Sequence, residues 1–158
     1  MNWFFELITN PYLIAPIAAW FVAQNLKVII DTVINKKFDP NRFFGDGGMP
    51  SCHSATVSAL ACICGLGQGF GSVEFALSAI FCAVVCRDAM GVRMETGKQA
   101  IVLNEFIKLF GKHSEKKLSS IKLKEFVGHT PLQVGAGIII GVGVSVAVYF
   151  IFGNFGAI

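Results

Sequence analysis

Charged side chains are scarce in this sequence. Asp, Glu, Lys and Arg make up 15% of its 158 residues, whereas 54% are hydrophobic, a larger apolar share than soluble domains usually have. Residues 1–10 contain neither Lys nor Arg, so the basic start of a cleaved secretory signal is missing and we expect the first apolar segment to be retained. Apolar runs extend from residue 11 to residue 152. The composition therefore predicts an integral membrane protein.

The cysteines also lack a metal-binding pattern. Cys62, Cys64, Cys82 and Cys86 lie inside apolar runs without the Cys/His spacing of a zinc site, and we interpret them as small buried apolar residues. Cys52 lies in a polar motif, but nothing near it resembles a cysteine nucleophile with its own base. We interpret it as a small residue that allows close backbone approach, and we expect no metal and no cofactor.

Four apolar segments are predicted to be membrane helices, at about residues 11–34, 54–67, 72–92 and 131–152. Crossing roughly 30 Å of hydrocarbon takes about 20 helical residues. The second segment is short for that length, but its Ser, Ala and Cys side chains suit a helix in close contact with its neighbours. We expect an all-α membrane helix bundle that forms a single domain over residues 1–158.

Two polar loops, at residues 35–53 and 93–130, separate these segments. The second loop also has apolar side chains at helical spacing, and this pattern predicts an amphipathic cytoplasmic helix on the membrane surface. A solvated charged helix and loop is the simpler alternative, and it explains most of the lysines there. The apolar residues of the pattern are Ile101, Leu103, Phe106, Ile107 and Phe110.

Basic residues gather on one side of the predicted bundle. With four spans, the two polar loops share one side and contain eleven of the thirteen Lys and Arg, while the termini and the glycine turn near residue 68 share the other side and contain none. The positive-inside rule then makes the loops cytoplasmic and the termini external. We expect the cell (plasma) membrane. Lys27 and Asp31 stand four residues apart on the first span, and we expect their face to look inward, because ionisable groups avoid lipid.

This topology brings three helix ends to one membrane face. The second span starts near Ser51 and His53, the fourth starts near His129 and Thr130, and the third ends between them. Two helix N-termini present unpaired amides and positive dipole ends to an anion. Phosphate is the most natural anion, since arginine matches its oxygens. Nearby basic side chains would add charge, namely Arg42, Arg93 and Lys98.

Two histidines beside one phosphate offer a mechanism that needs no metal. One imidazole attacks phosphorus and forms a phosphohistidine, while the other protonates the leaving oxygen and later activates water. A histidine at a helix start is also often a cap or a satisfied interfacial group, and this alternative stands for His53 and His129 when each is taken singly.

Three motifs occur in order along the chain: Gly-Gly-Met-Pro-Ser-Cys-His-Ser-Ala at 47–55, Asp-Ala-Met-Gly-Val-Arg-Met-Glu-Thr-Gly-Lys-Gln-Ala at 88–100, and Gly-His-Thr-Pro-Leu-Gln-Val at 128–134. Together they resemble the divergent type-2 phosphatidic acid phosphatase family, which is described as related to vanadium-dependent haloperoxidases and acid phosphatases. The resemblance covers nearly the whole chain. It implies a membrane phosphatase that acts on lipid phosphates.

The resemblance also implies residue roles. Residues 50–53 are similar to the superfamily's Pro-Ser-Gly-His motif, which supplies a hydroxyl, an amide and the acid histidine, with Cys52 in the glycine place. His129 resembles the nucleophilic histidine, but Leu123 occupies the place of the superfamily's Arg and Gln133 that of its Asp. A glutamine can orient an imidazole through its carbonyl, although it does not stabilise the imidazolium as a carboxylate does.

The superfamily's first basic motif, a Lys followed after six residues by Arg-Pro, is not matched. Lys36 and Arg42 have five residues between them, and Phe43 follows Arg42. We hypothesise that other basic residues replace the missing charges. The candidates are Arg93 and Lys98, or Lys122 and Lys124.

The leading prediction is a membrane phosphatase-like protein that acts on a lipid phosphate or diphosphate at the cytoplasmic face, with His129 as nucleophile and His53 as acid and base. Asp88 is predicted to support the site; as an alternative interpretation, it belongs to an inward-facing, buried ion pair. The predicted phosphate-binding residues are Ser51, Arg93, Lys98, Gly48, Arg42 and Thr130, and the predicted supporting residues are Asp88, Gln133 and Gln99.

Two other functions stay open at this point. The same cradle suits a non-catalytic protein that binds or transports phosphorylated lipid, and the glycine-rich helices suit a structural protein that makes oligomer contacts. The expected partners are a phosphorylated lipid or another phosphate-bearing substrate and the membrane bilayer, with a homo-oligomer left open and no nucleic acid.

Overall fold

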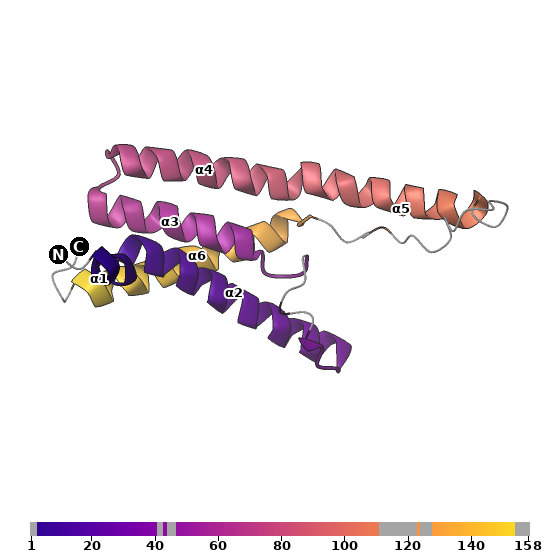
Figure 1. The fold of residues 1–158 in the computed structure, drawn as a ribbon, viewed down its shortest axis with the longest axis horizontal. Helices are drawn as coiled ribbons and strands as arrows, with labels where there is room; N and C mark the ends of the chain where they lie inside the picture. Colours follow the sequence, from indigo (N-terminus) through magenta and orange to yellow (C-terminus); the bar gives the residue numbers. More distant parts are fainter. Residues whose placement is uncertain (1–2, 41–42, 44–46, 111–122, 124–127, 154–158) are drawn as a thin grey trace.

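The computed structural model describes residues 3–40, 43, 47–110, 123 and 128–153. These residues form helices and no strand, which confirms the predicted all-α fold class (Figure 1). The helices begin and end within two residues of the four predicted spans, and two further helices flank them. The elements are α1 (Trp3–Ile8), α2 (Pro11–Asn35), α3 (Cys52–Gln68), α4 (Val73–Met90), α5 (Val92–Phe110) and α6 (Pro131–Gly153).

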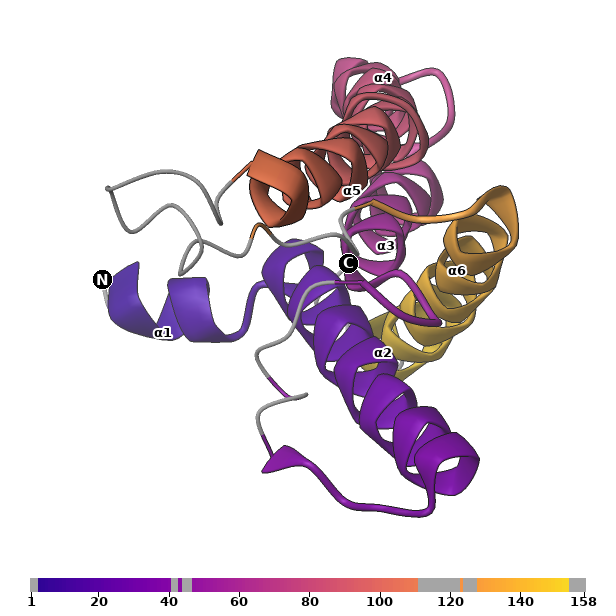
Figure 2. The same ribbon diagram turned by 90° about the vertical axis from the view of Figure 1, so that its right-hand side faces the viewer.

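Among the described residues, three helical stretches are long and apolar enough to cross a membrane, namely α2, α4 with α5, and α6. The second predicted span, α3, is the remaining one; it has 17 residues and lies in the middle of the bundle, in contact with α2, α4 and α6 (Figures 1 and 2). Large apolar side chains cover the outside of the outer helices; Leu77 and Ile139, for example, are 68% and 74% exposed. A surface of this kind is stable when lipid surrounds it.

Glycines bring α6 against α3. A Cβ added at Gly137 would lie 2.4 Å from the Ser51 carbonyl oxygen, and one added at Gly141 would lie 2.3 Å from that of Ala55. One turn further along, Ser145 Oγ donates a hydrogen bond of 2.7 Å to the Ala59 carbonyl. Small residues and interhelical hydrogen bonds of this kind drive helix association in lipid. They also fix where α6 starts relative to the start of α3.

The bundle has two distinct ends. The start of α2 and the end of α6 lie at the same end as the turn between α3 and α4 (Figure 1). The opposite end holds the starts of α3 and α6 and the junction of α4 with α5. This is the arrangement of helix ends that the four-span topology predicts, while the side of the membrane on which each end lies stays a prediction.

Helix α5 runs on from α4 and projects beyond the bundle (Figure 1). Gly91 joins the two helices without interrupting the backbone ladder, because its N–H donates to Arg87 at 2.9 Å and its carbonyl accepts from Glu95 at 3.0 Å. The predicted amphipathic helix is therefore present, with Phe106 and Leu109 55% and 70% exposed. It extends along the α4 axis and does not cross the bundle end, so its contact with a membrane surface stays a prediction.

Candidate functional site

His53 and His129 come together at the starts of α3 and α6. Their ring centroids are 6.4 Å apart. Two backbone hydrogen bonds hold this meeting point: the Ser51 N–H donates to the Gln133 carbonyl at 3.0 Å, and the His129 N–H donates to the carbonyl of Ala89 near the end of α4 at 2.9 Å. The three helix ends that the topology places on one face are thus joined directly.

The start of α6 is a capping box formed by Thr130 and Gln133. The Thr130 N–H donates to Gln133 Oε1 at 3.0 Å, and the Gln133 N–H donates to Thr130 Oγ1 at 3.4 Å. This reciprocal pair satisfies backbone donors that a helix start leaves open. The spacing Thr-x-x-Gln before an apolar run is a sequence signal for such a box, so this structural role of Gln133 was readable from the sequence.

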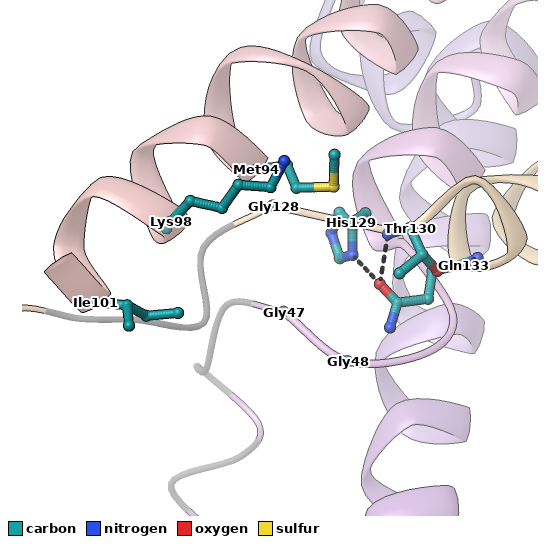
Figure 3. A pocket seen from close by; sticks show the side chains of 10 residues that line it. Gly47, Gly48, Met94, Lys98, Ile101, Gly128, His129, Thr130 and Gln133 are labelled. Carbon is teal, nitrogen blue, oxygen red and sulfur yellow. Dashed lines mark hydrogen bonds between the residues drawn. The ribbon is translucent and has the colours of Figure 1, made fainter.

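Gln133 also sets the state of the His129 ring. Its Oε1 atom lies 3.2 Å from Nδ1 of His129 (Figure 3). Because the same oxygen accepts from the Thr130 N–H, the orientation of the amide is determined, and Nδ1 must be the donor towards it. A neutral ring that donates from Nδ1 to Gln133 has its lone pair on Nε2. That is the form in which an imidazole attacks phosphorus.

His129 is buried, with 6% of its surface exposed, and its pKa is lowered from the ordinary value of 6.5. Burial is the main cause, and the positive charges of Lys27 and His53 lower the pKa further, whereas the hydrogen bonds to Gln133 and to the Gly48 carbonyl raise it. A lowered pKa keeps the ring neutral near pH 7. The neutral imidazole is therefore the resting form of this side chain.

A cleft of about 240 Å³ opens beside His129. One wall comes from α5, with Met94, Lys98 and Ile101 facing the opposite wall at Gly47 and Gly48 (Figure 3). Gly128 brings the chain close to α5, since a Cβ there would lie 2.5 Å from the Met94 nitrogen and its φ is +98°. The cleft is lined by Gly47, Gly48, Met94, Gly97, Lys98, Ile101, Gly128, His129, Thr130 and Gln133.

Lys27 belongs to this site, although the sequence did not identify it as a site residue. It lies on α2 with 5% of its surface exposed. A Cβ added at Gly48 would lie 3.6 Å from Lys27 Cγ, and the charge of Lys27 acts on His129. The available signal was the position of a lysine within a span, which indicates an inward-facing and functional group.

The basic residues predicted on the α5 segment form ion pairs with their own neighbours. Arg93 Nε lies 2.7 Å from Asp88 Oδ2, and Lys98 Nζ lies 2.6 Å from Glu95 Oε1. Lys98 lines the cleft, whereas Arg93 does not. Asp88 is 41% exposed, so the alternative of an inward-facing buried ion pair is wrong: its position on α4 lets Arg93 reach it from the next helix.

The other predicted site residues divide between the cleft and its support. Gly48 and Thr130 line the cleft, whereas Gln99 is exposed on α5 and is not part of the lining. Ser51 is completely buried, and its Oγ accepts from the N–H and the hydroxyl of Ser54 at 3.4 and 3.0 Å. Ser51 thus caps α3. Arg42, Lys122 and Lys124 lie outside the described residues.

Cys52 connects the start of α3 to α2. Its buried thiol donates to Gln24 Oε1 at 2.8 Å, and Gln24 Nε2 in turn donates to the Phe43 carbonyl. The thiol therefore has a packing and hydrogen-bonding role beside the site. Within the part of the chain that the structure describes, no group of three or more His, Cys, Asp or Glu side chains is placed to hold a metal ion.

The profile of the Divergent PAP2 family matches residues 8–144. The chain belongs to this family. The match includes both histidines and Lys27, and it confirms the resemblance that the three motifs indicated.

One curated protein is similar to this chain over nearly its whole length. The uncharacterized membrane protein YuiD of Bacillus subtilis (strain 168) is 38% identical over 157 residues, and the alignment covers 93% of this chain and 99% of that protein. No solved structure matches the chain significantly. With its three apolar helical stretches, this divergent PAP2 chain is a membrane protein.

Proposed function

We propose that this protein hydrolyses the phosphate ester or diphosphate of a membrane lipid through a phosphohistidine. The observation that carries the proposal is the pair of imidazoles, 6.4 Å apart between centroids, at the starts of α3 and α6. Each ring stands at a helix N-terminus, where the dipole favours a bound anion. This arrangement lets both rings reach one phosphoryl group.

The reaction proceeds in two steps. Nε2 of His129 attacks phosphorus and forms the N–P bond, while the P–O bond to the lipid breaks and protonated His53 gives its proton to the leaving oxygen. His53, now neutral, takes a proton from water, and the hydroxide attacks phosphorus. Phosphate leaves, and Nε2 of His129 regains its lone pair. His53 ends the cycle protonated, as it began.

The state of His129 supports this assignment. Nucleophilic attack needs a neutral ring with a free Nε2; burial lowers the pKa of His129, and Gln133 Oε1 lies within reach of a proton on Nδ1. The apolar side chains of Met94 and Ile101 line the cleft beside it, and they suit the first methylenes of a lipid chain. A lipid phosphate is therefore a better substrate for this cleft than a small polar ester.

Phosphate release from purified full-length protein tests the proposal. In nanodiscs with phosphatidic acid or a prenyl diphosphate, the wild type should release inorganic phosphate, and His129→Ala should abolish release. His53→Ala should slow release by about 10²–10⁴-fold, the usual contribution of a general acid and base. Gly143→Ala is the fold control, because a Cβ there meets nothing within 4 Å. Undiminished phosphate release by His129→Ala would refute the assignment of His129 as the nucleophile.

A non-catalytic role in binding or moving phosphorylated lipid is the second candidate. The observation in its favour is Gln133, which orients His129 but has no charge with which to stabilise an imidazolium. This function predicts tight binding of lipid phosphate without turnover. The affinity would then be unchanged when either His53 or His129 is replaced by alanine.

A further inference from the structure

The basic residues in the first two turns of α5 already have counter-ions. The Asp88 carboxylate lies against Arg93, and the Glu95 carboxylate lies against Lys98, both in exposed pairs. A phosphate that approached these side chains would compete with a neighbouring carboxylate and would meet little net charge. Among the described residues, a group other than Arg93 and Lys98 is therefore needed to offset the charge of an anion beside His129.

Lys27 is a buried cation without a counter-ion among the described residues. It is 95% buried, and within the described part of the chain it has neither a hydrogen bond nor an ion pair. An ammonium in that state is costly inside a protein, and more so in a membrane helix. No fully buried side-chain nitrogen or oxygen among the described residues lacks a partner, so the small exposed part of Lys27 includes its ammonium.

The surroundings of Lys27 indicate what this ammonium faces. Its Cγ and Cδ atoms lie 3.6 and 3.7 Å from the position of a Cβ on Gly48, the residue that forms the cleft wall opposite α5. Its charge is also felt at the His129 ring. The stem of Lys27 thus runs beside Gly48, and its charge acts on His129 from α2.

We infer that Lys27 is the cation that binds the phosphate group in this site, opposite the His53 and His129 rings. The inference rests on the proposed function, since it concerns the same site, and it assigns the positive charge to a membrane helix. It replaces the hypothesis that Arg93 and Lys98 supply that charge. The ligand class is a tetrahedral phosphate anion, either free phosphate or the headgroup of a lipid phosphate.

Binding of inorganic phosphate to the full-length protein tests the inference without requiring turnover. Wild type, Lys27→Met, Lys27→Arg and Lys108→Met are compared in phosphatidylcholine nanodiscs by calorimetric titration. Loss of a charge-assisted contact should weaken phosphate binding by at least about tenfold in Lys27→Met. Lys108→Met removes the same charge from an exposed position on α5 that does not line the cleft, and it should change affinity by less than about twofold.

Lys27→Arg and a measurement of thermal unfolding distinguish loss of the charge from loss of the fold. Lys27→Arg retains the charge and should keep more of the affinity than Lys27→Met. Removal of an uncompensated buried charge should leave the thermal unfolding temperature of Lys27→Met equal or higher, so a loss of affinity in a folded variant supports the inference. Equal affinities of wild type and Lys27→Met, or no saturable binding to wild type, would overturn it.

Two further arms separate this inference from the proposed function and identify the source of the phosphate. Wild-type protein that binds phosphate through Lys27 but releases none from lipid phosphates refutes the hydrolase and leaves the cation site in place. Hydrolysis of lipid phosphates by the wild type, together with equal phosphate affinities of wild type and Lys27→Met, refutes the cation site and leaves the hydrolase in place. Phosphatidic acid added to the nanodiscs should raise the apparent Kd for inorganic phosphate in wild type if a lipid headgroup occupies the site, and an unchanged Kd identifies free phosphate as its ligand.

Discussion

The side-chain oxygen of Gln133 lies 3.2 Å from Nδ1 of His129 and also accepts the N–H of Thr130 at 3.0 Å. One amide therefore caps α6 and orients the ring of the candidate nucleophile. Gln133 stands in the place of the superfamily's Asp, and its amide oxygen contacts the imidazole in the way that orients the ring. It has no negative charge with which to stabilise an imidazolium.

Replacement of Gln133 tests this division of roles. Gln133→Glu places a carboxylate in the same position, and its charge should raise the pKa of His129 by favouring the protonated ring. Gln133→Ala removes a hydrogen bond that raises this pKa and should lower it further. A pH titration of the His129 ring protons by NMR measures both shifts. Shifts in the same direction for the two variants would contradict the assigned role.

His53 should influence His129 through its charge. Because a protonated His53 lowers the pKa of His129, His53→Ala should raise it, and the same NMR titration measures the change. An unchanged pKa of His129 would show that the two rings do not interact electrostatically.

The pH dependence follows from the same group. Since the folded-state pKa of His129 lies below 6.5, the unfolded chain binds more protons as the pH falls, and stability from this residue is present above pH 6.5 and lost as the pH falls through the folded-state pKa. Both lipid phosphate hydrolysis and the unfolding temperature should decline over that acidic range. In His129→Ala, the decline in unfolding temperature should be smaller.

The contact between α3 and α6 predicts a matched pair of glycine variants. A Cβ at Gly141 would lie 2.2 Å from Ser58 Oγ and 2.3 Å from the Ala55 carbonyl oxygen, so Gly141→Ala should force the helices apart and destabilise the protein by about 1–3 kcal/mol. Gly143→Ala meets open space and should stabilise by up to about 1 kcal/mol through helix propensity. Thermal unfolding in detergent distinguishes the two, and equal effects would show that the contact is not tight.

Asn104 is predicted to hold the segment that leads to the site. Its buried amide donates to the Leu123 carbonyl and accepts from the Leu123 N–H, each at 2.9 Å. Asn104→Ala should leave that backbone without its partner and cost about 1–3 kcal/mol. Hydrogen exchange at the Leu123 amide should then be faster. Lys108→Ala, one turn further along α5, is the control and should leave this exchange rate unchanged.

The sequence by itself determined the membrane character, the helices and the meeting of His53 with His129. Spans follow from local composition and length, and their number decides which ends share a face, so side-chain detail is not needed. The capping box of Thr130 and Gln133 likewise depends only on residues that are close together in the sequence. Family membership follows from three ordered motifs, which is why it was predicted before any contact was known.

Only the tertiary structure decided which charges reach the site. Whether Lys98 lines the cleft while Arg93 turns to Asp88 depends on how each helix is rotated about its axis and on which carboxylate lies within reach. The approach of Lys27 to His129 joins residues about a hundred positions apart, and it depends on the packing of α2 and α6 against α3. Hydropathy and spacing place a residue along a helix, but contacts between helices determine the direction in which its side chain points.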